Sequence, residues 1–132
     1  MPRFERHFTI AEARAELPAL RRQLIKANDL VAEIRKRETE ESLGSTPLVR
    51  QNGRGPIVSG GSAQREAAQE ILNAIADSGI YIKDLARGLV DFPHFLEGDV
   101  DHEVFLCWHL GEDTIEYWHE IDDGFAGRVR IE

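Results

Sequence analysis

The chain has 132 residues, of which 42% are hydrophobic and 30% charged, and its formal net charge is −8. This composition is typical of a soluble globular protein with a single domain, 1–132. No apolar run approaches the roughly eighteen residues that span a bilayer, and the first residues lack the apolar centre of a secretory signal. We therefore expect a cytoplasmic protein without a membrane partner. The single cysteine, Cys107, cannot form an internal disulfide.

The charge is divided unevenly along the chain. Residues 1–54 carry 11 Lys or Arg against 8 Asp or Glu, a balance of +3, whereas residues 55–132 carry 5 against 16, a balance of −11. An acidic half repels the phosphate backbone of nucleic acids, and only the first half could supply a basic stripe. We therefore expect no nucleic-acid partner.

Residues 1–43 are predicted to form a long helix after a short lead-in. Thr9 and Glu12 have the spacing of a capping box, so the helix should begin at Ile10. Pro18 predicts a kink or a broken first turn. Apolar residues then recur every three or four positions, at Ile10, Ala13, Leu17, Leu20, Leu24, Ala27, Val31 and Ile34. This seam requires a partner, so we expect a homodimer through the N-terminal helix unless the C-terminal sheet covers the seam within one chain.

A flexible linker is predicted for residues 44–62, because they are rich in glycine, proline and serine and poor in apolar side chains. A second helix is predicted for residues 63–79, with Ser62 as its N-cap and Gly79 at its end. A long helix, a loop and a shorter helix together favour an antiparallel helical hairpin.

The remainder, residues 80–132, has the alternating pattern of strands. Pro93 suits an edge strand, or the end of a strand, in residues 88–96. A β-hairpin should follow, with a two-residue turn at Gly111-Glu112, which pairs Val104 with His119. This register places His119 on the core side and Cys107 on the opposite side. It also leaves Glu112 at the tip, roughly 23 Å from His119 at about 3.3 Å per residue.

Several short motifs of the C-terminal part, together with the start of the helix, resemble one family. They are Phe8-Thr-Ile-Ala-Glu-Ala13, Leu89-Val-Asp-Phe-Pro93, Leu106-Cys-Trp108, Leu110-Gly-Glu112, Tyr117-Trp-His119 and Gly124-Phe-Ala-Gly-Arg128. Their order is similar to that of the domain of unknown function 2203 family. The resemblance implies an uncharacterised bacterial protein with a helical first part and a strand-rich second part. It also draws attention to the motif residues Asp91, Cys107, Trp108, Glu112, Trp118, His119, Gly127 and Arg128.

Two sets of side chains could bind a divalent metal ion, since carboxylates, imidazoles and thiolates are suitable ligands. Asp91 and His119, with His94 or His102, would converge if the strand of Asp91 lies beside the hairpin. Cys107, His109 and Glu116 would be neighbours on the other face. The structural alternative for His119 is a buried imidazole that bonds to Asp91 or to a backbone carbonyl.

Arg128 follows a glycine-rich segment, and its guanidinium could hold a carboxylate or phosphate in bidentate fashion. Internal partners for it are Asp91, Asp122 and Asp123, which would fasten the C-terminal segment to the sheet. The sequence leaves both readings open.

The sequence thus predicts an α+β fold, in which a long N-terminal helical hairpin packs with a small antiparallel β-sheet of about three strands. The first functional hypothesis is an oligomerising interaction or structural protein that uses the helical seam. The alternative is a metal- or small-ligand-binding protein with a site around Asp91 and His119, with Arg128 as a further ligand-binding residue. Whether the chain is an enzyme, and which protein partner it has, stay open.

Overall fold

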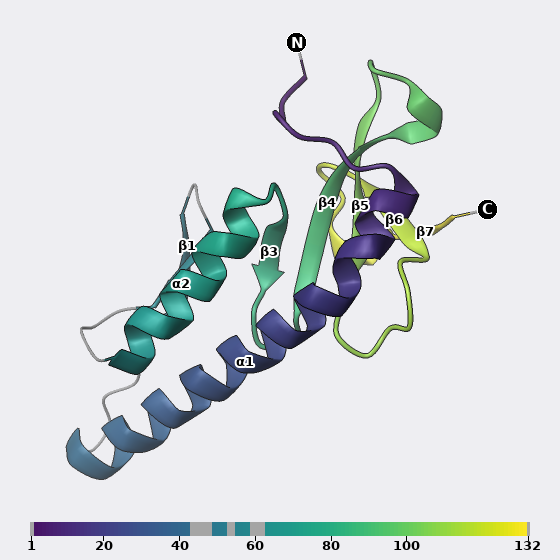
Figure 1. Ribbon diagram of the computed structural model, residues 1–132. Helices are drawn as coiled ribbons and strands as arrows, with labels where there is room; N and C mark the ends of the chain where they lie inside the picture. Colours follow the sequence, from purple (N-terminus) through teal and green to yellow (C-terminus); the bar gives the residue numbers. More distant parts are fainter. Residues whose placement is uncertain (1, 43–48, 53–54, 59–62, 132) are drawn as a thin grey trace.

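The computed structural model describes residues 2–42, 49–52, 55–58 and 63–131 of the chain. It is an α+β fold with a long N-terminal helix and an antiparallel sheet, as predicted (Figure 1). The helices are α1 (Ile10–Ser42) and α2 (Ala63–Asp77), and the short 3-10 turns are η1 (Leu96–Gly98) and η2 (Phe125–Gly127). The strands are β1 (Val49–Asn52), β2 (Gly55–Val58), β3 (Tyr81–Asp84), β4 (Leu89–Phe95), β5 (Glu103–Trp108), β6 (Tyr117–Glu120) and β7 (Val129–Arg130).

The main sheet has five strands in the order β3-β4-β5-β6-β7, so the prediction of about three strands was wrong. The additional strands, β3 and β7, are short and lie at the two edges. With four and two residues, they are too short to carry a run of alternating apolar residues that would mark a strand in the sequence. The strands follow one another as a meander, so every neighbouring pair is antiparallel.

Strand β4 lies inside the sheet, between β3 and β5, so of the two predicted places for Pro93, an edge strand or the end of a strand, the edge strand was wrong. Pro93 is tolerated there because β3 has already ended, since the β3–β4 pairing extends only to Asp91. The Pro93 carbonyl instead accepts a hydrogen bond of 2.7 Å from the Phe8 amide. Proline has no N–H, but an N–H at this position would point to the same side as the carbonyl, away from β5. No hydrogen bond between β4 and β5 is therefore lost.

Helix α1 begins with the predicted capping box. The Glu12 amide donates to the Thr9 hydroxyl at 3.0 Å, and the Thr9 amide donates to the Glu12 carboxylate at 2.9 Å. The helix continues through Pro18 as one element. Its first half crosses one face of the sheet, and its second half lies along α2 (Figure 1).

The apolar seam of α1 is buried by the chain itself. Side chains of the seam pack in one core with residues of α2 and of the α1-facing side of the sheet. The buried seam residues are Ala13, Leu17, Leu20, Leu24, Ala27, Val31 and Ile34. The sequence left two possibilities for covering this seam, a second chain or the same chain. In the structure the same chain covers it.

The predicted linker 44–62 contains structure that its composition did not indicate. Strands β1 and β2 pair as a two-stranded antiparallel ribbon, with Val49 opposite Val58. The rest of that segment, and Ser62 as the expected N-cap, lie outside the described residues. Helix α2 ends at Asp77, and Gly79 adopts the positive φ of 95° that favours glycine after a helix. Because the connection includes a β-ribbon, α1 and α2 pack together without forming the simple two-helix hairpin predicted.

The register of the β5–β6 hairpin differs from the predicted one by one residue. His119 lies opposite Phe105, and Glu120 takes the predicted place of His119 opposite Val104. The predicted two-residue turn was wrong, because residues 109–116 form a longer loop. Helix α1 holds this loop through Arg14, which donates to the Ile115 carbonyl at 2.8 Å and 3.2 Å. A shift of one residue moves every side chain of a strand to the other face of the sheet.

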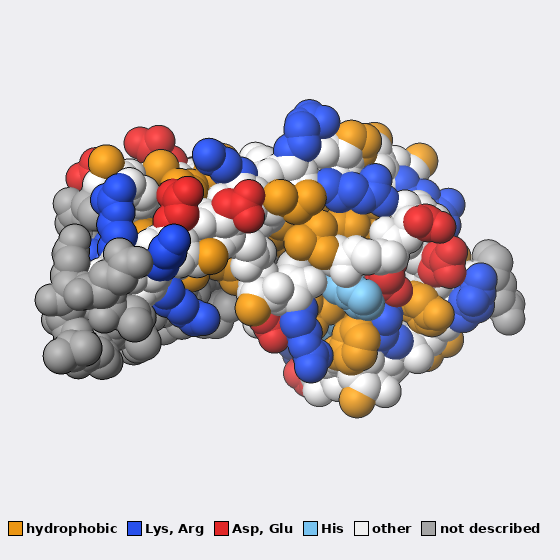
Figure 2. All heavy atoms as spheres, turned by 90° about the horizontal axis from the view of Figure 1, so that it is seen from below, with side chains coloured by type: hydrophobic (Ala, Val, Ile, Leu, Met, Phe, Trp, Pro, Cys, Tyr) orange, Lys and Arg blue, Asp and Glu red, His pale blue; other side chains and the backbone are white. Residues whose placement is uncertain are grey.

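Acidic and basic side chains are interspersed on the face of the molecule that Figure 2 shows. A histidine and several apolar side chains lie among them. Within the part of the chain that the structure describes, neither helix has the length and apolar character required to cross a membrane.

Candidate metal centre

Three buried residues with metal-ligating side chains meet on the face of the sheet opposite α1. Asp91 lies on β4 directly opposite Cys107 on β5, and His119 lies on β6 opposite Phe105. Their exposed fractions are only 2%, 1% and 2%, and their potential ligand atoms all lie within 4.8 Å of one another. Among the described residues, no other group of three such side chains converges in this way.

The small side chain of Cys107 allows Asp91 and His119 to meet. Strand β5 separates β4 from β6, so Asp91 and His119 are two strands apart, roughly 9.5 Å at the usual strand spacing. Their side chains nevertheless approach to 3.1 Å, between His119 Nε2 and Asp91 Oδ1. The one-residue register shift moves His119 to the face that carries Cys107, whereas the sequence prediction had placed His119 on the opposite, core side.

Both ring nitrogens of His119 face oxygen atoms. Nδ1 lies 2.7 Å from the Glu120 carbonyl, which can only accept, so Nδ1 carries a proton. Nε2 then meets the Asp91 carboxylate either as the second N–H of an imidazolium or as a lone pair that requires a cation. Burial lowers the pKa of His119, but the hydrogen bonds to Asp91 and Glu120 and the charge of Asp91 outweigh it, and the net shift is upward.

The Cys107 thiol is held in its protonated form. Burial, followed by the charge of Asp91, raises the pKa of the Cys107 thiol to about 12. A thiol with such a pKa is a poor nucleophile at neutral pH. Cys107 would become a thiolate only if a cation replaced its proton.

A small cavity of about 140 Å³ opens at this cluster. Its lining residues are Lys83, Leu89, Asp91, Cys107, His119, Ile121, Gly124 and Phe125. Lys83 Nζ lies 4.0 Å from Asp91 Oδ2 and 4.8 Å from the centre of the Phe105 ring. The carboxylate of Asp91 therefore lies near the side chains of both Lys83 and His119.

Arg128 closes one side of the cluster through a partner that the sequence analysis did not consider. Its Nη2 donates to both oxygens of Glu112, each at 2.7 Å, rather than to Asp91, Asp122 or Asp123. Its guanidinium also lies over the rings of Tyr117 and Phe125, at 4.0 Å and 4.6 Å. Because Phe125 lines the cavity, Arg128 holds one of its walls. Glu112, which the sequence places at the turn of the hairpin, lies in the loop between β5 and β6 and accepts these bonds from Arg128.

The other predicted candidates lie elsewhere. His94 bonds to the Phe8 carbonyl and His102 to the Glu120 carboxylate, so neither joins Asp91 and His119. His109 lies at the end of β5, where its Nδ1 bonds to the Leu110 carbonyl. Glu116 pairs with Arg130, so the set of Cys107, His109 and Glu116 does not form.

The fold and the site define an α+β protein with a five-stranded sheet. A carboxylate, an imidazole and a thiol are buried together on the face of this sheet opposite α1. The family model described as "Uncharacterized conserved protein (DUF2203)" matches residues 6–131, and the chain belongs to this family. No curated protein and no solved structure matches the chain significantly.

Proposed function

We propose that the protein binds one divalent transition-metal ion through Asp91, Cys107 and His119. The observation that carries this proposal is the convergence of three buried ligand atoms within 4.8 Å of one another. Thiolate, imidazole and carboxylate together form a donor set that suits zinc and similar ions. Three protein ligands leave a fourth position for water or a small molecule.

The spacing of the three ligand atoms is close to what an ion requires. Ligands of a tetrahedral zinc ion at about 2.0–2.3 Å lie roughly 3.3–3.7 Å from one another. The contact of 3.1 Å between Asp91 and His119 is already that short. Closing the longest separation requires side-chain movements of about 1 Å, which rotations of the Asp91 and Cys107 side chains can supply.

The surroundings of His119 also suit a metal ligand. A histidine that ligates a metal commonly donates its other ring N–H to a carbonyl or carboxylate, which fixes the tautomer. The Glu120 carbonyl has this role for Nδ1 and directs the Nε2 lone pair toward Asp91.

Metal binding would leave the charge of the cluster unchanged. Without an ion, a protonated His119, a protonated Cys107, the Asp91 carboxylate and Lys83 sum to +1. With a divalent ion, neutral His119, the Cys107 thiolate, Asp91 and Lys83, the sum is again +1. One ion replaces two protons, so metal affinity should increase as the pH rises.

The direct test is elemental analysis of protein purified without a chelator, followed by titration of the metal-free protein with Zn²⁺ or Co²⁺. We expect one ion per chain. Substitutions in the second layer around a metal cost about 10–100-fold in affinity, so His119→Ala and Cys107→Ser should cost at least as much. His102→Ala is the matched control, because His102 bonds to Glu120 outside the cluster. A folded protein that takes up no ion in the titration would contradict the proposal.

The homodimer through the N-terminal helix stays a prediction, as do the cytoplasmic location and the lack of a nucleic-acid partner. The seam that suggested the dimer is buried inside the chain. A dimer through α1 would therefore have to use another face of this helix, such as the one with Ile25, which is 51% exposed.

A further inference from the structure

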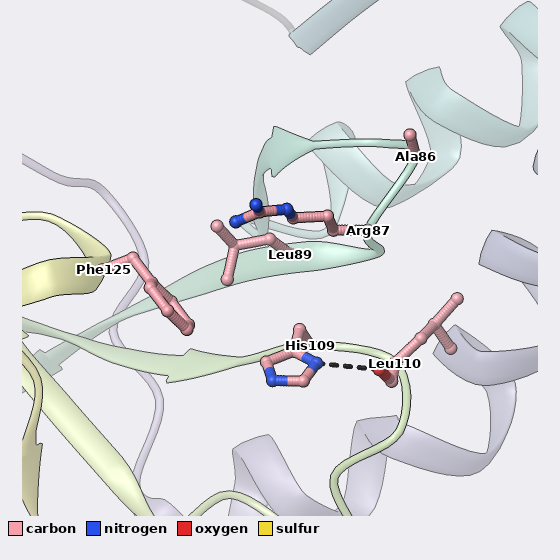
Figure 3. Close-up of a pocket in the computed structure, with 6 residues that line it drawn as sticks. All are labelled: Ala86, Arg87, Leu89, His109, Leu110 and Phe125. Carbon is pink, nitrogen blue, oxygen red and sulfur yellow. Dashed lines mark hydrogen bonds between the residues drawn. The ribbon is translucent and has the colours of Figure 1, made fainter.

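A hollow of about 490 Å³ lies on the surface beside the proposed metal centre (Figure 3). It is formed by the turn between β3 and β4, the residues after β5, and η2. Its lining residues are Ala86, Arg87, Leu89, His109, Leu110 and Phe125. The volume falls in the range of small-molecule sites, about 300–1,000 Å³.

The hollow and the metal cavity meet. Leu89 and Phe125 line both of them, so a molecule in the hollow lies against the same two side chains that border Asp91, Cys107 and His119. In the pleated strand β4, Leu89 is two residues from Asp91 and points to the same face. The two spaces are therefore adjacent, with Leu89 and Phe125 as their common border.

The charge of the hollow comes from Arg87. In the part of the chain that the structure describes, no acidic side chain lines it, and apart from His109 the remaining walls are apolar. Figure 3 shows the Arg87 and His109 side chains on opposite sides of the hollow, with the Phe125 ring at one end. Arg87 forms an ion pair with Asp84, whose Oδ2 lies 3.8 Å from Nε, and the Arg87 amide donates to Asp84 Oδ1 at 3.2 Å. Within the described residues, no hydrogen bond engages the two terminal nitrogens of Arg87.

We propose that this hollow binds a small organic carboxylate, whose carboxylate pairs with Arg87 and whose apolar body lies over Leu89 and Phe125 toward the metal centre. The planar guanidinium fork matches a carboxylate in bidentate geometry, and the apolar walls favour an aromatic or aliphatic body. This inference rests on the proposed function in one respect, since the apolar body of the ligand would lie beside the metal centre.

The test uses benzoate as the probe and its uncharged analogue benzamide as the control ligand. Both are titrated by calorimetry into the metal-free and the zinc-loaded chain. We expect benzoate to bind both forms, and benzamide to bind at least about fivefold more weakly, because it lacks the charge-assisted bonds. Arg87→Gln should weaken benzoate by a similar factor, and Arg87→Lys, which keeps the charge without the fork, should weaken it less.

Arg22→Gln on the exposed side of α1 is the control variant, and benzoate should bind it as it binds the wild-type chain. Equal binding of benzoate and benzamide, or equal binding of benzoate by the wild-type chain and Arg87→Gln, would overturn the inference. Uptake of zinc is measured on the same samples. If zinc binds and benzoate does not, only this inference fails; if benzoate binds with the expected dependence on Arg87 and zinc does not, only the proposed function fails.

Discussion

At the scale of single residues, Cys107 combines two roles in the proposed centre. Its small side chain leaves the space in which Asp91 and His119 meet across β5, and its sulfur is the third ligand atom. A larger side chain at this position would separate the carboxylate from the imidazole. Burial and the charge of Asp91, which raise the pKa of the Cys107 thiol to about 12, keep the thiol protonated beside the carboxylate.

Glu103 is a second residue whose carboxylate organises its surroundings. It accepts hydrogen bonds from the Arg3 and Phe4 amides, at 2.7 Å and 3.2 Å, and lies 2.7 Å from His7 Nε2. The N-terminal segment is thereby fixed on the sheet, where Phe4 packs against the Phe105 ring at 5.1 Å. Burial raises the pKa of Glu103, but these hydrogen bonds and the charge of His7 outweigh it and lower the net value.

A lowered pKa fixes the direction of the pH dependence. The stabilisation by ionised Glu103 is present above its unfolded pKa of about 4.5 and is lost as the pH falls through the lower folded value. Urea unfolding of the wild-type chain should therefore show a loss of stability below about pH 4.5 that Glu103→Gln reduces. Glu70→Gln, on the exposed side of α2, is the control. A variant with the same acid dependence as the wild-type chain would show that Glu103 has no such role.

The proximity of Asp91 and His119 could be expected from the sequence because the strand of Asp91 was expected to lie beside the hairpin that carries His119. The inclusion of Cys107 could not be expected. It depends on a register that differs by one residue from the simplest hairpin, and that register is fixed by contacts of the loop with Arg14, about a hundred positions away in sequence. The pair of Arg128 and Glu112 was missed for the same reason, because Glu112 lies in this loop.

At the scale of elements, the turn between β3 and β4 is joined to the loop after β5 by one close contact. Gly88 has φ +64°, its carbonyl accepts a hydrogen bond of 3.3 Å from the Leu110 amide, and a Cβ on it would overlap the Leu110 side chain. Leu110 and the turn both line the proposed carboxylate hollow. The shape of the hollow therefore depends on a glycine at position 88.

Gly88→Ala and Gly98→Ala form a matched pair that separates this packing from backbone strain. Gly98 also has a positive φ, +77°, but nothing lies within 4 Å of a Cβ there. Both variants should lose about 1–2 kcal/mol of unfolding free energy from the backbone, and Gly88→Ala about 1–3 kcal/mol more from overpacking. Chemical denaturation measures both, and equal losses would contradict the close contact with Leu110.

Elements with local signals could be predicted well, and those without could not. The capping box of Thr9 and Glu12 and the glycine after α2 act within a few residues, so the sequence marks the start of α1 and the end of α2. Strands β1, β2, β3 and β7 have four residues or fewer, and pairing with a neighbour defines them more than their own composition does.

At the scale of the whole molecule, α1 is the element that unites the two parts of the protein. Its seam packs against the sheet in one half and along α2 in the other, and all of these residues share one core (Figure 1). A heptad-like pattern did not distinguish this arrangement from a coiled-coil dimer, because both bury the same stripe of side chains.

Adjacent residues of α1 test this arrangement. Leu24 is fully buried and Ile25 is 51% exposed. Leu24→Ala should reduce the free energy of unfolding by about 2–5 kcal/mol, whereas Ile25→Ala should change it by no more than about 0.5 kcal/mol. The losses should be independent of protein concentration. A loss for Leu24→Ala that changes with concentration would instead indicate that the seam is buried between two chains.

The central claim is the metal centre of Asp91, Cys107 and His119, and X-ray absorption spectroscopy of the zinc-loaded protein tests it most directly. The spectrum should show one sulfur at about 2.3 Å together with nitrogen and oxygen ligands at about 2.0–2.2 Å. In Cys107→Ser the sulfur should disappear. A zinc environment without sulfur in the wild-type chain, or one that Cys107→Ser leaves unchanged, would contradict the account.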